Sequence, residues 1–324
     1  GAIGYLIGEE NRGLEYMFVM MNAARFAVGV QGIAVAERAY QQAVAYAKDR
    51  LQSRDVAGSS GAVPIIRHPD VRRMLMTMRA HTEAARALAC VAAAASDAGH
   101  HAADEAARRE NMAVYEFLVP IVKGWSTEMS LEVTSLGVQV HGGMGFIEET
   151  GAAQHYRDAR ILTIYEGTTA IQANDLIGRK TARDGGAVAR ALIAKVRETE
   201  AQLSARGGAD LTAIAGRLSA GRAALEAAVD FMVGAFKGDV RAAFAGSVPY
   251  LKLAGVVLSG WQMARAALAA DELLKAGDGD AEFLASKIAT ARFHADHLLT
   301  QAGALLAAAT EGAAGVLAMP ETAF

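Results

Sequence analysis

The chain has 324 residues, enough for a sizeable buried core and for more than one domain. Hydrophobic residues make up 52% of it and aromatic residues only 6%, so the apolar mass consists mainly of Ala, Leu, Val and Met. The formal net charge of −3 gives no reason to expect nucleic acid or an anionic membrane as a partner.

Helix-forming composition, with only 5 prolines and no clear alternating pattern, predicts an all-α protein. Apolar residues at three- and four-residue intervals predict a first long helix over residues 14–50. A second helix is expected over residues 69–99, because Pro69 suits the first helical position. A third helical region covers residues 104–140, where Pro120 marks either a kink or a fresh start.

The motif HGGMG, residues 141–145, ends the third helical region, because glycine can adopt the left-handed conformation that closes a helix. As a phosphate-binding loop this motif alone is a weak indication. The stretch 146–165 is polar and shows no clear period. Thr169, followed three residues later by Gln172, matches a capping box, which predicts a helix that begins at Thr169 or Ala170.

Glycine-rich breaks divide the second half of the chain into Ala- and Leu-rich segments. These segments predict four helices that pack as a bundle. Their expected ranges are 187–206, 210–236, 248–276 and 281–311. The change in sequence pattern beyond residue 180 predicts a domain boundary near Asp184. One helical domain is expected over residues 1–184 and a second helical bundle over residues 185–324.

Cysteine and histidine usage indicates neither disulfide nor metal chemistry. The single cysteine, Cys90, excludes an intrachain disulfide, fits a reducing, cytoplasmic location, and is expected to be a small core residue. The histidine pairs His100–His101 and His294–His297 match no zinc spacing, so no metal site is expected. No uncharged stretch with strong hydrophobicity reaches the length that a membrane span requires, and we therefore expect no membrane partner.

Glu166 stands out because it lies directly before the helix that is expected to begin near Thr169, with Gly167 beside it to allow a sharp turn. One interpretation is a surface acid that interacts favourably with the positive end of the helix dipole, worth about 0.3–1 kcal/mol. The other is a functional carboxylate. Spacing alone favours the first interpretation.

The stretch IYEGTTAIQ, residues 164–172, resembles the signature of the acyl-CoA dehydrogenases, in which this glutamate is the catalytic base. Residues 1–180 are similar to the C-terminal helical domain of that family. The resemblance implies FAD as cofactor, an acyl-CoA as substrate, and α,β-dehydrogenation to a trans-2-enoyl-CoA. In this reaction Glu166 would remove the α-proton while a hydride passes to the flavin N5 atom.

The same resemblance assigns roles to further residues of EGTT and to residues in three other motifs. MMNAARF implies that Asn22 and Arg25 contact the substrate, and EGTT places Gly167 beside the thioester. YAKDRLQ and QVHGG resemble elements that contact FAD in this family, those around Arg50 and Gln139 serving the flavin of a neighbouring subunit, which implies a dimer. The cofactor-binding residues that follow from the resemblance are Arg50, Gln52, Gln139, Val140, His141, Gly142, Gly143, Thr168 and Thr169.

LVPIVKGW, IQANDLIGRK and the long helical extension resemble the branch that includes the methylmercaptopropionyl-CoA dehydrogenases. The extension resembles an element that favours a homodimer, and electrons are expected to leave through an electron-transfer flavoprotein. The family's N-terminal helical and middle β domains are absent from this sequence. Two alternatives stay open: an acyl-CoA oxidase, which passes electrons to oxygen, and a non-catalytic helical assembly module.

Overall fold

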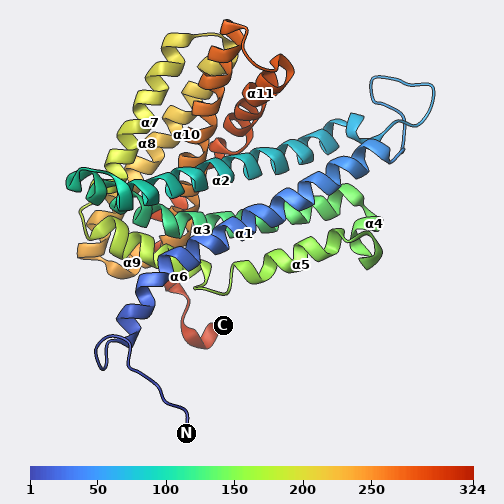
Figure 1. Cartoon of the computed structure of the whole chain (residues 1–324). Helices are drawn as coiled ribbons and strands as arrows, with labels where there is room; N and C mark the ends of the chain where they lie inside the picture. Colours follow the sequence, from blue (N-terminus) through green and yellow to red (C-terminus); the bar gives the residue numbers. More distant parts are fainter.

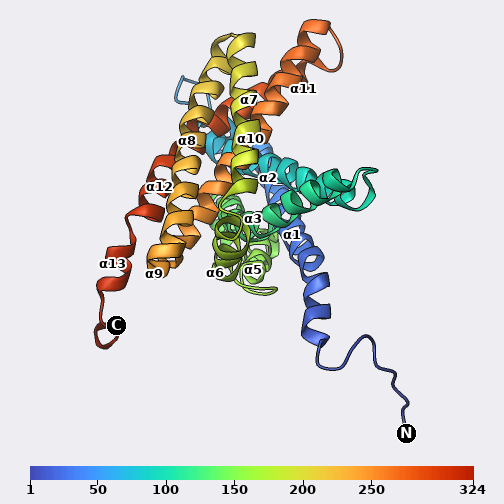
Figure 2. The same ribbon diagram turned by 90° about the vertical axis from the view of Figure 1, so that its left-hand side faces the viewer.

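The computed structural model describes residues 1–324, apart from the side chain of Val19. Over these described residues the chain is all-α, as predicted, and contains no β-strand. Its nearest approach to sheet pairing is an isolated antiparallel bridge between Leu51 and Pro64, which closes the loop after the first helix. Four helices of the second half, α7, α8, α10 and α11, rise from a layer formed by α1, α2 and α3 (Figures 1 and 2).

Three long helices form this layer: α1 (Gly13–Asp49), α2 (Pro69–His101) and α3 (Glu105–His141), with the short turn η1 (Ile65–Arg67) before α2. Their ends follow the predicted chemistry. Pro69 occupies the first turn of α2, and Gly142, with φ of +61°, ends α3. At the start of α3, the Asp104 side chain accepts a hydrogen bond from Ala107 N at 2.8 Å. The helix continues through Pro120, so the alternative of a fresh start there is wrong.

Short helices follow α3: α4 (Gly143–Phe146), η2 (Glu148–Thr150), α5 (Ala152–Leu162), α6 (Thr169–Asp175) and the π-helix η3 (Leu176–Ala182). The sequence did not predict α5. The reason is that this helix buries only Ala152, Ala159 and Leu162, and its remaining positions are mostly polar and exposed. Three apolar residues are too few to produce a recognisable helical period.

The second half contains five helices of at least nine residues: α7 (Ala187–Arg206), α8 (Ala209–Gly238), α10 (Ser247–Ala276), α11 (Ala281–His297) and α12 (Ala302–Thr310). Shorter elements are α9 (Val240–Ala245), η4 (Leu299–Gln301), α13 (Ala313–Ala318) and η5 (Glu321–Ala323). The first three of the four predicted helices are confirmed. The fourth is wrong as a single helix, because the chain breaks at Leu298 and turns so that both Leu298 and Leu299 become buried.

The two halves of the chain share one hydrophobic core, centred on α10, which packs on both α2 and α3. Glycines allow this close approach in both directions. A Cβ atom at Gly255 of α10 would lie 2.2 Å from the Trp125 ring of α3, and one at Gly124 of α3 would lie 2.7 Å from Leu251 of α10. These contacts leave no room for a side chain at either glycine, so a large side chain of each helix packs directly on the glycine of the other.

Length and composition alone would allow two helices, α1 and α10, to cross a membrane when a few charges are tolerated. For α10 the apolar window is 78% buried inside the protein, which is the property of a core helix. For α1 the corresponding window is 29% buried. Leu14, Met17 and Phe18, near the start of this helix, are exposed.

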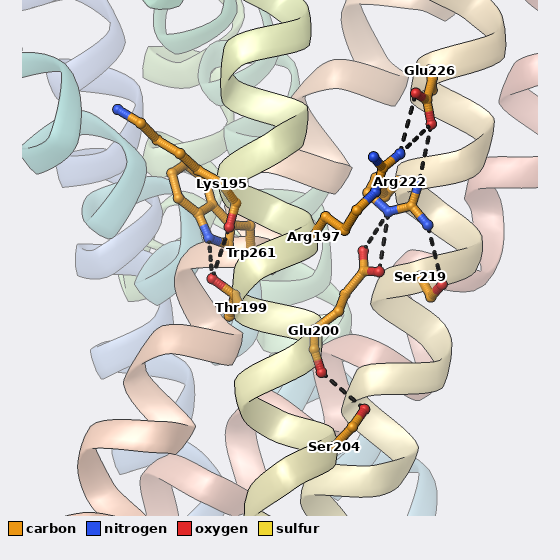
Figure 3. A network of polar contacts seen from close by, with 9 residues as sticks. All are labelled: Lys195, Arg197, Thr199, Glu200, Ser204, Ser219, Arg222, Glu226 and Trp261. Carbon is orange, nitrogen blue, oxygen red and sulfur yellow. Dashed lines mark hydrogen bonds and ion pairs between the residues drawn. The ribbon is translucent and has the colours of Figure 1, made fainter.

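A polar network links α7, α8 and α10 (Figure 3). The Trp261 indole N–H of α10 donates to Thr199 Oγ1 of α7 at 2.8 Å. Beside it, Arg222 Nε of α8 donates to Glu200 Oε1 of α7 at 2.8 Å, and both side chains are largely buried. This pairing fixes the register of the three helices within the second half of the chain.

Candidate active site

Glu166 has a left-handed backbone conformation, with φ of +55°, and Gly167 after it has φ of +89°. Non-glycine residues rarely adopt this region, because the Cβ atom crowds the backbone. Such strain persists only where surrounding structure enforces it, and it concentrates at functional sites. The strained backbone at Glu166 therefore favours a functional role, which its sequence spacing alone did not indicate.

Hydrogen bonds to both peptide oxygens hold this loop in place. Lys123 Nζ of α3 donates to the Gly167 carbonyl at 2.6 Å, and Gln172 Nε2 donates to the carbonyls of Glu166 and Gly167, each at 3.3 Å. Thr169 N donates to the Thr163 carbonyl at 3.1 Å, which closes the loop at its base. Because the backbone of the loop is fixed at several points, the position of the Glu166 side chain is constrained as well.

The carboxylate and the backbone N–H of Glu166 have no hydrogen-bond or ion-pair partner among the described residues, and the residue is half-buried. An unpaired carboxylate next to an unpaired N–H can accept a proton and donate a hydrogen bond to the same ligand. The loop thus combines a fixed backbone with free polar groups at Glu166.

The predicted capping box is wrong by one residue. Thr168, with φ of −59° and ψ of +166°, is the N-cap of α6, and its Oγ1 accepts from Ile171 N at 3.4 Å. The Thr169 hydroxyl instead donates to Glu128 Oε1 of α3 at 2.5 Å. The left-handed residues before Thr168 shift the start of the helix, and Gln172 bonds the loop rather than the cap. The helix nevertheless begins at Thr169, as predicted.

Several charged side chains are buried beneath the loop. Lys123 is fully buried. Burial, and then the nearby charge of Arg25, lower the pKa of Lys123 to about 8, while Glu128 and Glu166 act in the opposite direction. Arg25 is itself buried and pairs with Asp175 of α6 at 3.3 Å. The loop therefore rests on a compact group of mutually dependent charges.

The sequence assigned Asn22 and Arg25 to the substrate. Asn22 is half-buried on α1 and Arg25 lies one turn further along the helix, where its guanidinium faces Asp175. Arg25 Nε is buried and has no hydrogen-bond partner in the protein. The substrate roles of these two residues, and of Gly167, stay predictions.

A second group of predicted residues comes together at a hollow of about 600 Å³. This volume lies within the range of small-molecule and cofactor pockets. Its lining includes seven of the nine residues that the sequence assigned to FAD: Arg50, Gln52, Gln139, Val140, His141, Gly142 and Gly143. The other two, Thr168 and Thr169, lie at the Glu166 loop instead.

The hollow is lined by exposed polar side chains, and behind them lies a His141 ring that is held by stacking and by a hydrogen bond. Arg50, Gln52 and Gln139 are exposed, and Arg50 closes α1 through its N–H to the Tyr46 carbonyl at 2.9 Å. Behind them, the His141 ring stacks on Tyr46 at 4.4 Å between centroids, and its Nδ1 pairs with the Gly137 carbonyl at 2.7 Å. A Cβ atom at Gly142 or Gly143 would meet nothing within 4 Å, so this backbone faces open space.

The two groups lie far apart along the helical layer. Arg25 and Arg50 are 25 residues apart along α1, which corresponds to about 38 Å. Lys123 at the loop and Gln139 at the hollow are 16 residues apart along α3, or about 24 Å. Figure 1 shows α6 near the start of α1, and α4 with the loop after α1 at the far end. One small ligand cannot bridge both groups within this chain.

The sequence did not identify Lys123, Glu128 or Gln172 as parts of the site. Each acts through a contact between segments distant in the chain or through a backbone carbonyl. A single lysine within the apolar run LVPIVKGW was the available clue, because lysine is almost never fully buried without a partner. As for metals, the described residues contain no group of three or more His, Cys, Asp or Glu side chains that could hold an ion.

A family model described as "Acyl-CoA dehydrogenase, C-terminal domain" matches residues 11–181. The chain belongs to the acyl-CoA dehydrogenase family. A second model, described as "Acetyl-CoA dehydrogenase C-terminal like", matches residues 192–320. The recognition of this family from sequence is therefore confirmed.

Two curated relatives show the same similarity over nearly the whole chain. The chain is 58% identical to 3-methylmercaptopropionyl-CoA dehydrogenase of Ruegeria pomeroyi, over 94% of this chain and 51% of that protein. It is 35% identical to the broad-specificity linear acyl-CoA dehydrogenase FadE5 of Mycobacterium tuberculosis, over 92% of this chain and 51% of that protein. The chain thus spans about half the length of the curated relatives it matches.

Solved structures share the fold. An acyl-CoA dehydrogenase of Bacillus anthracis complexed with FAD matches with a TM-score of 0.72 at 20% identity, covering 98% of this chain and 52% of that one. Caenorhabditis elegans ACDH-11 in complex with C11-CoA matches with a TM-score of 0.69 at 19% identity, covering 90% of this chain and 46% of that one. Both therefore place the two halves of the chain in one known arrangement.

Proposed function

We propose that this chain supplies the catalytic base of an FAD-dependent acyl-CoA dehydrogenase, which converts an acyl-CoA thioester to a trans-2-enoyl-CoA. The observation that carries the proposal is Glu166 itself. Its backbone is left-handed and held at both carbonyls, while its carboxylate and N–H have no partner among the described residues. Family membership supports the same reaction class.

Removal of the α-proton of an acyl thioester leaves negative charge on the thioester oxygen. The reaction therefore needs a base near the α-carbon and hydrogen-bond donors near that oxygen. In this proposal the Glu166 carboxylate accepts the α-proton and the Glu166 N–H donates to the thioester oxygen. Bound FAD would supply the acceptor for the hydride that leaves the β-carbon. The fixed loop keeps both groups of Glu166 in place during proton transfer, which avoids reorganisation.

We propose the hollow at the end of α1 and α3 as an FAD-binding surface. The exposed Arg50 guanidinium suits a diphosphate, and the amides of Gln52 and Gln139 can serve polar edges of the cofactor. The open backbone at Gly142 and Gly143 permits close approach of a flat group. These residues fit the cofactor that the family and a solved neighbour imply.

We further propose a homodimer, because the hollow lies about 24 Å or more from the Glu166 loop along the helices. In such a dimer the hollow of one subunit holds the cofactor that works with Glu166 of the other. The reduced cofactor would pass its electrons to an electron-transfer flavoprotein. For the organisation of the chain we propose two units that meet near Asp184, supported by family matches that end at residue 181 and resume at residue 192.

The proposal is tested with Glu166→Gln in the FAD-loaded enzyme that contains this chain. Glutamine preserves the size of the side chain but cannot accept the α-proton. We expect anaerobic flavin reduction by an acyl-CoA to slow by about 10²–10⁴-fold, as is usual when a general base is lost. Stopped-flow absorbance of the flavin gives the rate.

Glu282→Gln is the matched control, since Glu282 is likewise an acid near the start of a helix, in the first turn of α11. It should leave the rate unchanged. A Glu166→Gln enzyme that reduces its flavin within a few-fold of wild type would show that Glu166 is only an acid at a helix start.

A further inference from the structure

Lys123 is fully buried in the middle of α3, and the proposed reaction does not use it. Burial of a lysine ammonium is costly unless polar partners replace its water. Its hydrogen bond goes to the Gly167 carbonyl, at 2.6 Å. Lys123 is therefore a fully buried lysine that contacts the loop of the proposed base.

Other partly buried lysines of the chain behave differently. Lys180 Nζ lies 2.8 Å from a carboxylate oxygen of Glu116, and Lys287 Nζ lies 2.9 Å from one of Glu83. No carboxylate oxygen of the described residues lies within 4.0 Å of Lys123 Nζ. Lys123 therefore differs from the ion-pair lysines, because its charge is directed at a backbone carbonyl.

We propose that Lys123 is a positioning residue, which holds the Gly167 carbonyl and thereby keeps Glu166 in its left-handed conformation with its carboxylate free. This inference rests on the proposed function of Glu166. A hydrogen bond from an ionised donor is stronger than a neutral one. Gln172 Nε2 reaches the same carbonyl at 3.3 Å, so the shorter contact from Lys123 is the dominant restraint.

The surrounding charges explain how Lys123 stays charged enough for this role. Burial, and then Arg25 on α1, disfavour the ammonium, whereas Glu128 on α3 and Glu166 in the loop favour it. The resulting pKa of about 8 leaves most of the side chain protonated at neutral pH. Asp175 of α6 lies 3.3 Å from Arg25 and 2.6 Å from Arg179, so it offsets only part of the Arg25 charge near Lys123.

The test compares Lys123→Met with wild type in the FAD-loaded enzyme, by hydrogen–deuterium exchange and by flavin reduction. The Thr169 amide reports on the loop, because it bonds the Thr163 carbonyl at the loop base. We expect its exchange to rise about tenfold or more and the rate of flavin reduction to fall about 10- to 100-fold, with KM changed much less than kcat. Lys180→Met, which removes an ion pair away from the loop, should change neither quantity.

Exchange of the Thr169 amide that stays within twofold of wild type in Lys123→Met would overturn the inference, and so would faster exchange with an unchanged reduction rate. If Lys123→Met does not fold, Lys123→Gln replaces it, since glutamine keeps an N–H donor and removes the charge. We expect intermediate exchange in Lys123→Gln, and wild-type exchange would overturn the inference. A Glu166→Gln enzyme with normal activity would refute the proposed function, whereas the exchange result would still decide whether Lys123 holds the loop.

Discussion

The Glu166 loop and the hollow beside Arg50 are built in opposite ways. At the Glu166 loop, a strained backbone rests on buried charges, and hydrogen bonds from α3 and α6 hold its carbonyls. At the hollow beside Arg50, the polar groups are exposed and the glycine backbone faces open space. Proton transfer needs one carboxylate in one place, whereas a large cofactor needs a broad surface with several contacts. The difference in construction matches the two roles that we propose for the loop and the hollow.

The largest expected difference between the Glu166 loop and the hollow is in how stability depends on pH. Between pH 8 and 10.5, folded Lys123 has lost its proton while the unfolded chain still holds one, so the unfolded state binds more protons. The free energy of unfolding should therefore rise with pH in this window by up to about 3 kcal/mol from this residue. Below pH 8 the folded and unfolded states both hold the Lys123 proton, so this gain in the free energy of unfolding is lost.

Chemical denaturation of wild type and Lys123→Met across pH 7.5–10 measures this effect. Wild type should gain stability relative to Lys123→Met as pH rises. Parallel curves for the two proteins would mean that the loop does not rest on a buried cation, and the contrast with the exposed hollow would disappear.

Replacing one glycine of the loop and one glycine of the hollow by alanine sharpens the comparison. At Gly167, φ is +89° and a Cβ atom would lie 2.7 Å from Gln172 Nε2, so Gly167→Ala should displace the loop. We expect flavin reduction to slow by about 100-fold, as for a small misplacement of a catalytic group. At Gly142, φ is +61°, but an added Cβ atom would meet nothing within 4 Å. Gly142→Ala should cost about 1 kcal/mol of stability through backbone strain. Its Cβ atom should also weaken FAD affinity, because it enters the proposed cofactor surface, but the reduction rate at saturating FAD should stay near wild type.

Stopped-flow rates and thermal unfolding of both variants check this pair of expectations. Equal losses of activity in Gly167→Ala and Gly142→Ala would show that the two ends are equally sensitive, and the proposed difference between a rigid loop and an open surface would be wrong.

The smallest effect is expected for Arg50→Gln at the hollow. Arg50 is exposed, so the free energy of unfolding should change by less than about 0.5 kcal/mol. Loss of a charge-assisted hydrogen bond to the cofactor diphosphate should weaken FAD affinity by about tenfold. Titration of the apoprotein with FAD measures this change. An unchanged affinity would argue against Arg50 as a cofactor ligand.

Helix positions were predictable where short-range chemistry decides them. Residues 187–206 were predicted with the observed bounds of α7, because Gly186 and Gly207 have positive φ and stop the helix at both ends. The helix α5 escaped prediction because it buries only three residues along one narrow face. Cys90 is exposed rather than buried as expected, since in an alanine-rich helix no apolar pattern distinguishes the inner face from the outer one.

The site was predictable only in part, for a related reason. Family resemblance singled out Glu166, and it also singled out seven residues that the structure brings together at the hollow. Local pattern placed the cap at Thr169 rather than Thr168, because the left-handed turn at Glu166 cannot be read from residue types alone. The role of Lys123 depends on a contact across 44 residues, which no periodicity encodes.

The central claim, that the Glu166 carboxylate takes the α-proton, is tested most directly by deuterium uptake. The substrate is an acyl-CoA whose β-carbon is replaced by sulfur, so that an α-proton can leave but no β-hydride can. In D₂O the wild-type enzyme should introduce deuterium at the α-carbon rapidly, and Glu166→Gln should do so no faster than buffer. Uptake by Glu166→Gln within a few-fold of the wild-type rate would contradict the claim.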